Sequence, residues 1–224
     1  LKFAYKEHQE VFEEEISRIM SNASYVMGPE IEKLERELSL FTGAKYAISC
    51  SSGTDALMLA MMALDIKPGD EIITTPFTFI STSETIALLG AKPVFVDIEE
   101  ETFNIDAELI EAKITNRTKA IIPVSLFGQV SDMDKINSIA KKYKLDVIED
   151  AAQSFGATYK GKKSCNLSDL ACTSFFPAKP LGCFGDGGAV FTSNESFAKK
   201  IKSLRVHGQT KSYNHKYIGL CARL

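Results

Sequence analysis

Two kinds of short segment alternate from Lys45 to Asp150, and this alternation constrains the fold more than any other feature of the sequence. Runs rich in β-branched and aromatic residues alternate with runs whose apolar residues recur at helical spacing. We predict strands at residues 45–50, 71–76, 92–98, 119–128 and 145–150, and helices at 54–64, 81–90, 106–114 and 131–143. This order predicts an α/β fold, with a largely parallel sheet and helices on both of its faces.

The segments on either side of this region complete the predicted domain. Two amphipathic helices are expected before it, at 7–21 and 29–41, and Pro29 suits the first turn of the second. After Ala152 we predict a hairpin around Gly161, strands at 171–176 and 187–193, and a last helix at 194–205. Residues 1–210 are therefore predicted to form one α/β domain.

The composition argues against several classes of function. Charged residues make up 25% of the chain and the formal net charge is -3, so no basic face for nucleic acid and no polybasic membrane anchor is expected. The apolar runs are too short to span a bilayer and the first residues do not resemble a signal peptide, which predicts a cytoplasmic protein. The five cysteines contain no CxxC pair and the three histidines offer no zinc spacing, so we predict reduced thiols and no metal site.

Polar motifs follow three of the predicted strands, at the edge of a parallel sheet where ligands bind. The first is SSGTD, in which Gly53 and Thr54 stand at the start of a predicted helix. Backbone N–H groups and a hydroxyl group at a helix start can hold a phosphate. The alternative is an ordinary helix cap, in which Thr54 or Asp55 satisfies the helix end.

The second motif is VIEDAAQ, in which a buried strand ends on Asp150 and Gln153 follows three residues later. A buried aspartate needs a cationic or hydrogen-bonding partner. One helical turn would bring Gln153 to the same side as Asp150. The alternative is that Asp150 simply caps a short helix that follows it.

The third motif is SFFPAKPLG, in which Pro177 and Pro180 stiffen the loop around Lys179. Apolar surroundings favour the neutral amine, which can form a Schiff base with an aldehyde. The alternative is a surface lysine whose charge stays in water. Together the three motifs predict one ligand, pyridoxal phosphate, with its phosphate at Thr54, its ring nitrogen at Asp150 and its aldehyde at Lys179.

The order of these motifs resembles that of a known family. The stretches that carry the resemblance are SSGTDAL, TTPFTFIST, VIEDAAQSFGA, SFFPAKPLGCFGDGGA and IGLCARL. They are similar to the DegT/DnrJ/EryC1/StrS sugar aminotransferases, and AIIPVSLFGQ and KSCNLSDLACTSFFPAKPLGC are similar to members that aminate a UDP-linked 3-keto-N-acetylglucosaminuronic acid. The resemblance implies the large domain of a PLP-dependent transferase of fold type I, a mostly parallel, seven-stranded mixed sheet flanked by helices.

The resemblance also implies roles for single residues. Lys179 is expected to form the Schiff base, and Asp150 is expected to contact the pyridine nitrogen. Gln153 is expected to contact the phenolic oxygen, Thr54 and Ser174 to bind the phosphate, and Phe79 to stack on the cofactor ring. Gly53 is a further expected cofactor-binding residue, and Tyr25 and Arg223 are expected to contact the sugar nucleotide.

The implied activity is transfer of an amino group from glutamate to a nucleotide-linked keto sugar, for lipopolysaccharide or other surface glycan biosynthesis, by a homodimer with shared active sites. Ala178 and Cys221 stand where relatives usually have serine and asparagine. The family continues past Leu224 into a smaller C-terminal domain, so we expect that domain to be missing and 211–224 to begin the connection to it. A truncated, non-catalytic protein that binds pyridoxal phosphate or a nucleotide sugar is the alternative.

Overall fold

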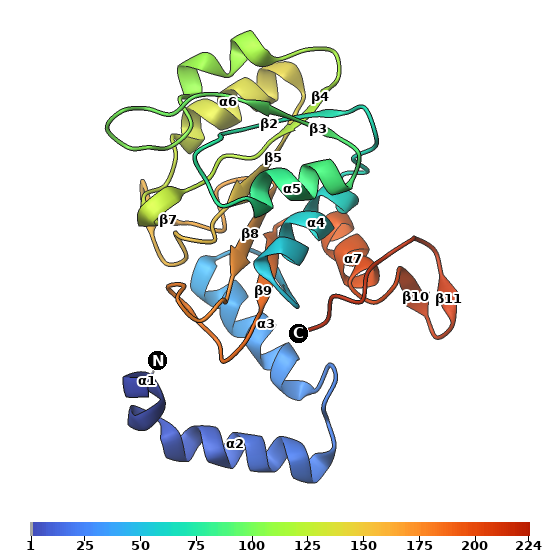
Figure 1. Ribbon diagram of the computed structural model, residues 1–224. Coiled ribbons are helices and arrows are strands. Elements are labelled where there is room, and N and C mark those ends of the chain that lie inside the picture. Colours follow the sequence, from blue (N-terminus) through green and yellow to red (C-terminus); the bar gives the residue numbers. More distant parts are fainter. Residues whose placement is uncertain (1) are drawn as a thin grey trace.

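A seven-stranded mixed sheet forms the centre of the computed structural model, which describes residues 2–224 (Figure 1). The strand order is β1-β9-β8-β5-β4-β2-β3, and β9 alone runs antiparallel to its neighbours. The strands are β1 (Tyr46–Cys50), β2 (Glu71–Thr74), β3 (Lys92–Phe95), β4 (Thr118–Ile121), β5 (Asp146–Asp150), β8 (Leu170–Ser174) and β9 (Gly188–Thr192). The predicted fold class is confirmed, including the mixed sheet that the resemblance implied.

Helices cover both faces of this sheet. They are α3 (Pro29–Thr42), α4 (Gly53–Ala63), α5 (Ser81–Leu88), α6 (Met133–Tyr143) and α7 (Glu195–Leu204), whereas α1 (Lys2–Glu7) and α2 (Gln9–Asn22) extend away from the sheet (Figure 1). On one face α4 packs on the strands and contacts both α5 and α7, whereas α3 and α6 pack on the other face. None of the helices between residues 2 and 224 has both the length and the apolar composition that crossing a membrane requires.

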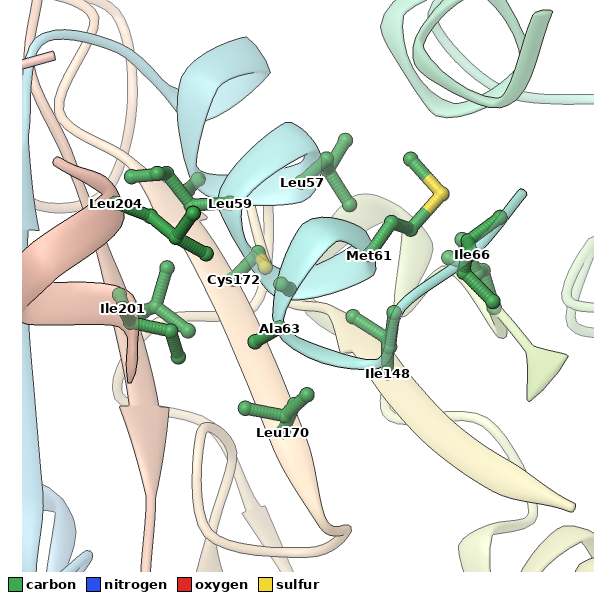
Figure 2. Close-up of a cluster of buried hydrophobic side chains, with 14 of the residues drawn as sticks. Leu57, Leu59, Met61, Ala63, Ile66, Ile148, Leu170, Cys172, Ile201 and Leu204 are labelled. Atoms are coloured by element: carbon green, nitrogen blue, oxygen red, sulfur yellow. The ribbon is translucent and has the colours of Figure 1, made fainter. Parts of the chain in front are cut away.

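Successive side chains of the strands enter different hydrophobic cores. In β5, Ile148 belongs to the cluster under α4 and α7, whereas Val147 belongs to the cluster under α6. Figure 2 shows the first of these clusters, in which side chains of α4 and α7 such as Leu59 and Leu204 lie over strand residues such as Leu170. Burial on both faces explains why the strands consist of nearly continuous apolar runs and do not alternate with polar residues.

One predicted helix is wrong. The segment 106–114 forms two short 3-10 turns, Ala107–Leu109 and Glu111–Lys113, and no α-helix. Side chains three residues apart lie above one another in a 3-10 turn, and this geometry places Ala107 and Ile110 together in the core under α6. The same spacing of three also occurs on an α-helix, which is why the apolar pattern suggested one.

The strand predicted at 119–128 is shorter than expected. β4 ends at Ile121, and the chain turns through a 3-10 segment at Leu126–Gly128. Because Pro123 has no N–H group for the strand ladder, only a single bridge between Val124 and Asp150 continues the pairing.

Two small hairpins lie outside the sheet. The first pairs β6 (Thr158–Tyr159) with β7 (Lys162–Lys163), and it is the hairpin predicted around Gly161. The second pairs β10 (Gln209–Lys211) with β11 (Asn214–His215), and it spans the boundary placed at residue 210. Farther along, Ala222 is fully buried in the core beneath α4 and α7. The division of the chain at residue 210 remains a prediction.

Among residues 2–224 no further strand pairs with the outer edge of β1, and an ion pair closes this edge. Glu35 of α3 accepts hydrogen bonds from the N–H group and the hydroxyl group of Ser49, each at 3.0 Å, and pairs with Arg205, which follows α7. Arg205 Nη1 also donates to the Ser49 carbonyl oxygen at 2.7 Å. The side chains of Glu35 and Arg205 are only 12% and 5% exposed, so removing either one leaves a buried charge without its partner.

Replacing Glu35 by leucine should therefore lower the free energy of unfolding by about 3–5 kcal/mol, because the Arg205 guanidinium loses its counter-charge. Urea unfolding followed by circular dichroism measures this change. On the same helix, Glu37→Leu removes a carboxylate that is 58% exposed. That control should change the free energy of unfolding by less than about 0.5 kcal/mol, and equal effects of the two substitutions would contradict the role of the ion pair.

Candidate active site

A cavity of about 880 Å³ lies at the carboxyl ends of β5 and β8, beside the first turn of α4. The loops after β2, β5 and β8 contribute to its walls. Seven of the residues predicted for the site line this cavity together: Gly53, Thr54, Phe79, Asp150, Gln153, Ser174 and Lys179. The fold thus brings to one place the three motifs that lie far apart along the chain.

The start of α4 leaves the side chain of Thr54 free for other contacts. The cap of this helix is Ser52, whose hydroxyl oxygen accepts a hydrogen bond from the Asp55 N–H at 3.0 Å. Neither Thr54 nor Asp55 is the cap that the alternative interpretation expected. The Thr54 hydroxyl lies 2.8 Å from the hydroxyl of Ser81, which also lines the cavity.

Close packing beside the same helix start explains the glycine at residue 53. A Cβ atom there would lie 2.6 Å from the Cβ of Ser174, closer than such atoms approach one another. Ser174 ends β8, and its hydroxyl oxygen accepts a hydrogen bond from the Phe176 N–H at 3.2 Å. The missing side chain therefore lets the first turn of α4 approach the end of β8.

Asp150 ends β5 with only 5% of its surface exposed. Its Oδ2 accepts a hydrogen bond from the Thr82 hydroxyl at 2.8 Å, and its Oδ1 accepts one from the Ala152 N–H at 3.2 Å. Burial raises the pKa of this carboxyl group, while the two hydrogen bonds and the charge of Lys179 oppose that shift. No helix follows β5 directly, so Asp150 is not the helix cap of the alternative interpretation.

Gln153 lines the cavity near Asp150. It lies in a turn, whereas the sequence had suggested one turn of helix. Its side-chain oxygen accepts a hydrogen bond from the Phe127 N–H at 3.1 Å. Phe127 has a φ of 54°, in the left-handed region that residues with a side chain seldom adopt. The position of Gln153 thus depends on an unusual backbone conformation in the loop after β4.

Lys179 lies half-buried in the loop between β8 and β9. Two backbone hydrogen bonds close the base of this loop, from Phe175 N–H to the Gly187 carbonyl at 2.7 Å and from Cys183 N–H to the Phe175 carbonyl at 2.8 Å. Inside the loop, the Lys179 N–H donates to the Phe176 carbonyl at 2.8 Å. Lys179 is therefore held in a folded loop, half-buried at the cavity wall.

Three of the predicted residues lie at or beyond the rim. Phe79 lines the cavity, yet 69% of its surface is exposed. Tyr25 is 61% exposed and its hydroxyl donates to the Met20 carbonyl at 3.4 Å, whereas Arg223 donates to the Cys221 sulfur at 3.1 Å. Neither Tyr25 nor Arg223 lines the cavity, so their contact with a substrate remains a prediction.

The sequence interpretation missed the hydroxyl groups around the start of α5. Ser81 and Thr82 line the cavity, the first next to Thr54 and the second bonded to Asp150. The available signal is the stretch TFISTSET, which concentrates hydroxyl residues just after the predicted strand 71–76. Hydroxyl residues at a helix start usually serve as caps, and this ordinary role hid their position in the cavity.

The groups in the cavity fit pyridoxal phosphate. A phosphate requires N–H and hydroxyl donors, which the start of α4 offers at Thr54 with Ser174 beside it. A protonated ring nitrogen requires a carboxylate such as the buried Asp150, and an aldehyde requires an amine such as Lys179. The cavity volume also falls within the range of about 300–1,000 Å³ that small-molecule sites occupy.

Comparison with known proteins places the chain among aminotransferases. The profile of the DegT/DnrJ/EryC1/StrS aminotransferase family matches residues 6–224. The UDP-2-acetamido-2-deoxy-3-oxo-D-glucuronate aminotransferase of Pseudomonas aeruginosa is 59% identical over 209 residues, which are 93% of this chain and 58% of that protein.

Solved structures agree with this placement. DesV of S. venezuelae, in complex with a ketimine intermediate, superposes with a TM-score of 0.97 at 39% identity, over 100% of this chain and 60% of that one. NtdA of Bacillus subtilis, with the bound cofactor PMP, superposes with a TM-score of 0.91 at 38% identity, over 97% of this chain and 50% of that one. The chain therefore spans between half and about 60% of the length of these relatives.

A second carboxyl group lies directly beneath the cavity. Glu149 precedes Asp150 in β5, so its side chain points to the other face of the sheet, where it is fully buried. Burial raises the pKa of this carboxyl group to about 7, although hydrogen bonds from Ser164, Cys165 and Ser125 oppose the shift. In the native state the Glu149 carboxyl group therefore loses its proton at a higher pH than its ordinary pKa of 4.5.

Stability should consequently depend on pH through Glu149. A group with a raised native pKa stabilises the fold fully below its unfolded pKa, and this contribution is lost as the pH rises through the native pKa. From pH 5 to pH 8, the free energy of unfolding of the natural chain should fall by about 2–3 kcal/mol relative to Glu149→Gln. Urea unfolding across this pH range measures the difference, and a constant offset between the two proteins would contradict the assignment.

Proposed function

The chain belongs to the DegT/DnrJ/EryC1/StrS aminotransferase family, and we propose that it forms the cofactor-binding domain of a pyridoxal-phosphate-dependent sugar aminotransferase. The observation that carries the proposal is one cavity lined together by Lys179, the buried Asp150 and Thr54. Each comes from a different part of the sheet edge, and each suits a different group of the same cofactor. The PMP bound to NtdA supports this choice of cofactor.

Several residues of the chain would hold the cofactor. Thr54 and Ser174 would bind the phosphate at the start of α4, where Gly53 leaves room for close approach. Phe79 would cover one face of the ring, and Gln153 would donate a hydrogen bond to the phenolic oxygen. When bound, pyridoxal phosphate supplies an aldehyde and an electron-withdrawing ring, which allow an amino group to be exchanged between two substrates.

Asp150 and Lys179 would handle the protons. The Asp150 carboxylate would keep a proton on the ring nitrogen, and the Thr82 hydroxyl fixes the orientation of that carboxylate through its bond to Oδ2. The Nζ of Lys179 would hold the aldehyde carbon as a Schiff base formed with loss of water, and once the amino group of the donor has displaced it, the freed amine would accept the proton from the donor's α-carbon. Both tasks of Lys179 need its amine close to the reacting atoms, and the closed loop holds this residue at the cavity wall.

We further propose a UDP-linked 3-keto-N-acetylglucosaminuronic acid as the amino acceptor. The name of the relative from Pseudomonas aeruginosa, at 59% identity, supports this substrate. Tyr25 and Arg223 are the proposed contacts of the sugar nucleotide, and the fork of an arginine suits a sugar carboxylate. The proposal also names glutamate as the amino donor. It places the protein in the cytoplasm as a homodimer with shared active sites, with a role in the synthesis of lipopolysaccharide or other surface glycans.

Borohydride reduction in the presence of pyridoxal phosphate should attach the cofactor to Lys179, because the lysine that forms the Schiff base is trapped by reduction. Peptide mapping by mass spectrometry locates the modified residue. Lys179→Ala should abolish this labelling, whereas Lys162→Ala, which removes an exposed lysine of a hairpin outside the sheet, should leave it intact. Cofactor that is bound before reduction yet is trapped on another lysine would rule out the assignment.

Asp150→Asn should slow amino transfer from glutamate by about a hundredfold or more, because an amide does not keep the ring nitrogen protonated. The rate is measured from the loss of cofactor absorbance after mixing with glutamate. Asp146→Asn, at the opposite end of β5, should leave the rate unchanged. A chain that binds the cofactor but shows no absorbance change with glutamate would favour the non-catalytic alternative.

A further inference from the structure

Glu149 is buried beside the proposed active site, and none of the steps described above uses it. We propose that the Glu149 carboxyl group is a positioning residue that fixes the two loops holding Gln153, and through them the contact of Gln153 with the cofactor. The part that concerns the cofactor rests on the proposed function. The part that concerns the loops stands on the geometry of this chain.

The first connection leads to the turn after β5. The Ser164 hydroxyl donates to Glu149 Oε1 at 2.7 Å, and the hydroxyls of Ser164 and Ser154 lie 2.7 Å apart. Ser154 directly follows Gln153 in the chain. Glu149, Ser154 and Ser164 are at most 1% exposed, so water does not compete for these hydrogen bonds. Glu149 therefore anchors the turn that carries Gln153.

The second connection leads to the loop after β4. The Ser125 hydroxyl lies 3.4 Å from the same Oε1, and the Ser125 N–H donates to the Asp150 carbonyl at 3.0 Å. Two residues later, the Phe127 N–H donates to the side chain of Gln153. Because the left-handed conformation of Phe127 is unfavourable by itself, the surrounding contacts must hold it in place. Ser125 supplies such a contact, because its hydroxyl group and its N–H group both bond to residues of β5, Glu149 and Asp150.

The third connection explains why a carboxyl group occupies this position. Glu149 Oε2 accepts a hydrogen bond at 3.0 Å from the N–H of Cys165, a residue with a φ of 71°. One side chain therefore accepts hydrogen bonds from two segments that are remote in sequence, at Ser125 and at Ser164 with Cys165, and it reaches the turn after β5 through Ser164. An apolar residue would fill the same volume without the cost of burying a carboxyl group, but it could not accept these bonds.

The variants that test the proposal form two matched pairs. Glu149→Leu removes both acceptor oxygens. Glu149→Gln keeps one of them, and it provides the test if the leucine variant fails to fold. Glu71 provides the control, because it is also a buried strand glutamate, 2% exposed and bonded to Thr115 and Arg117. It begins β2, at the opposite end of the same sheet from the cavity. Glu71→Leu and Glu71→Gln therefore report the general effect of disturbing a buried carboxylate.

Hydrogen exchange of the Phe127 amide, measured without cofactor by NMR, tests the effect on the loops. This exchange should become about tenfold faster in Glu149→Leu and change in the same direction in Glu149→Gln, since the bond to Gln153 opens more often. The Glu71 variants should leave it unchanged. Unaltered exchange in every Glu149 variant that folds, or equal acceleration in the Glu71 controls, would overturn the proposal whether or not the protein binds the cofactor.

A double-mutant cycle tests the effect on the cofactor. Glu149→Gln should weaken the affinity for pyridoxal phosphate by about tenfold in the natural background, and by much less in a Gln153→Ala background, because the effect passes through Gln153. Equal losses in both backgrounds would refute this route. Failure of the unaltered protein to bind pyridoxal phosphate would refute the proposed function, and the exchange of the Phe127 amide alone would then decide the role of Glu149.

Discussion

The burial of a carboxyl group at the end of β5 is the constraint on which the rest of the site depends. Asp150 is almost without contact with water, so its oxygens must find donors within the protein. Thr82 at the start of α5 and the N–H of Ala152 after β5 supply hydrogen bonds, and the charge of Lys179 acts on it from the loop after β8. Three segments that are distant in sequence are thereby held around one carboxyl group.

The strand β5 presents carboxyl groups to both faces of the sheet at adjacent residues. Asp150 faces the cavity, and Glu149 faces the serine-rich network on the other side. Each group is buried, and the charge of Asp150 further raises the pKa of Glu149. Such a pair is tolerated because each side chain has its own hydrogen-bond donors. The strand thus serves binding on one face and the placement of loops on the other.

Most of the sheet could be predicted from the sequence, because each strand and helix carries its own local pattern. The segment 106–114 could not, because the three-residue spacing of Ala107 and Ile110 suits an α-helix and a 3-10 turn equally well. The role of Thr82 was also hidden, because its partner Asp150 is 68 residues away and no local pattern reports such a contact. The mixed character of the sheet came from the resemblance, since the direction of β9 depends on pairing that short-range spacing does not encode.

The position of Lys179 follows from the one strand that breaks the parallel order. Parallel neighbours need a crossover that carries the chain from the carboxyl end of one strand back to the amino end of the next. Antiparallel β8 and β9 need only a loop that joins the carboxyl end of β8 to the adjacent start of β9. Residues 175–187 therefore stay at the carboxyl end of β8, where the cavity lies.

The same strand joins the loop to the proposed phosphate site. A Cβ at Gly188, where β9 begins, would lie 2.5 Å from the Ser52 carbonyl oxygen, so glycine is needed for β9 to run against the start of α4. Within the loop, a Cβ at Gly182 would lie 2.6 Å from the Pro177 carbonyl oxygen, and its absence allows the tight closure around Lys179. Two close backbone approaches in the β8–β9 connection thus bring the amine and the helix start to the same cavity, and a continued parallel crossover would have separated them.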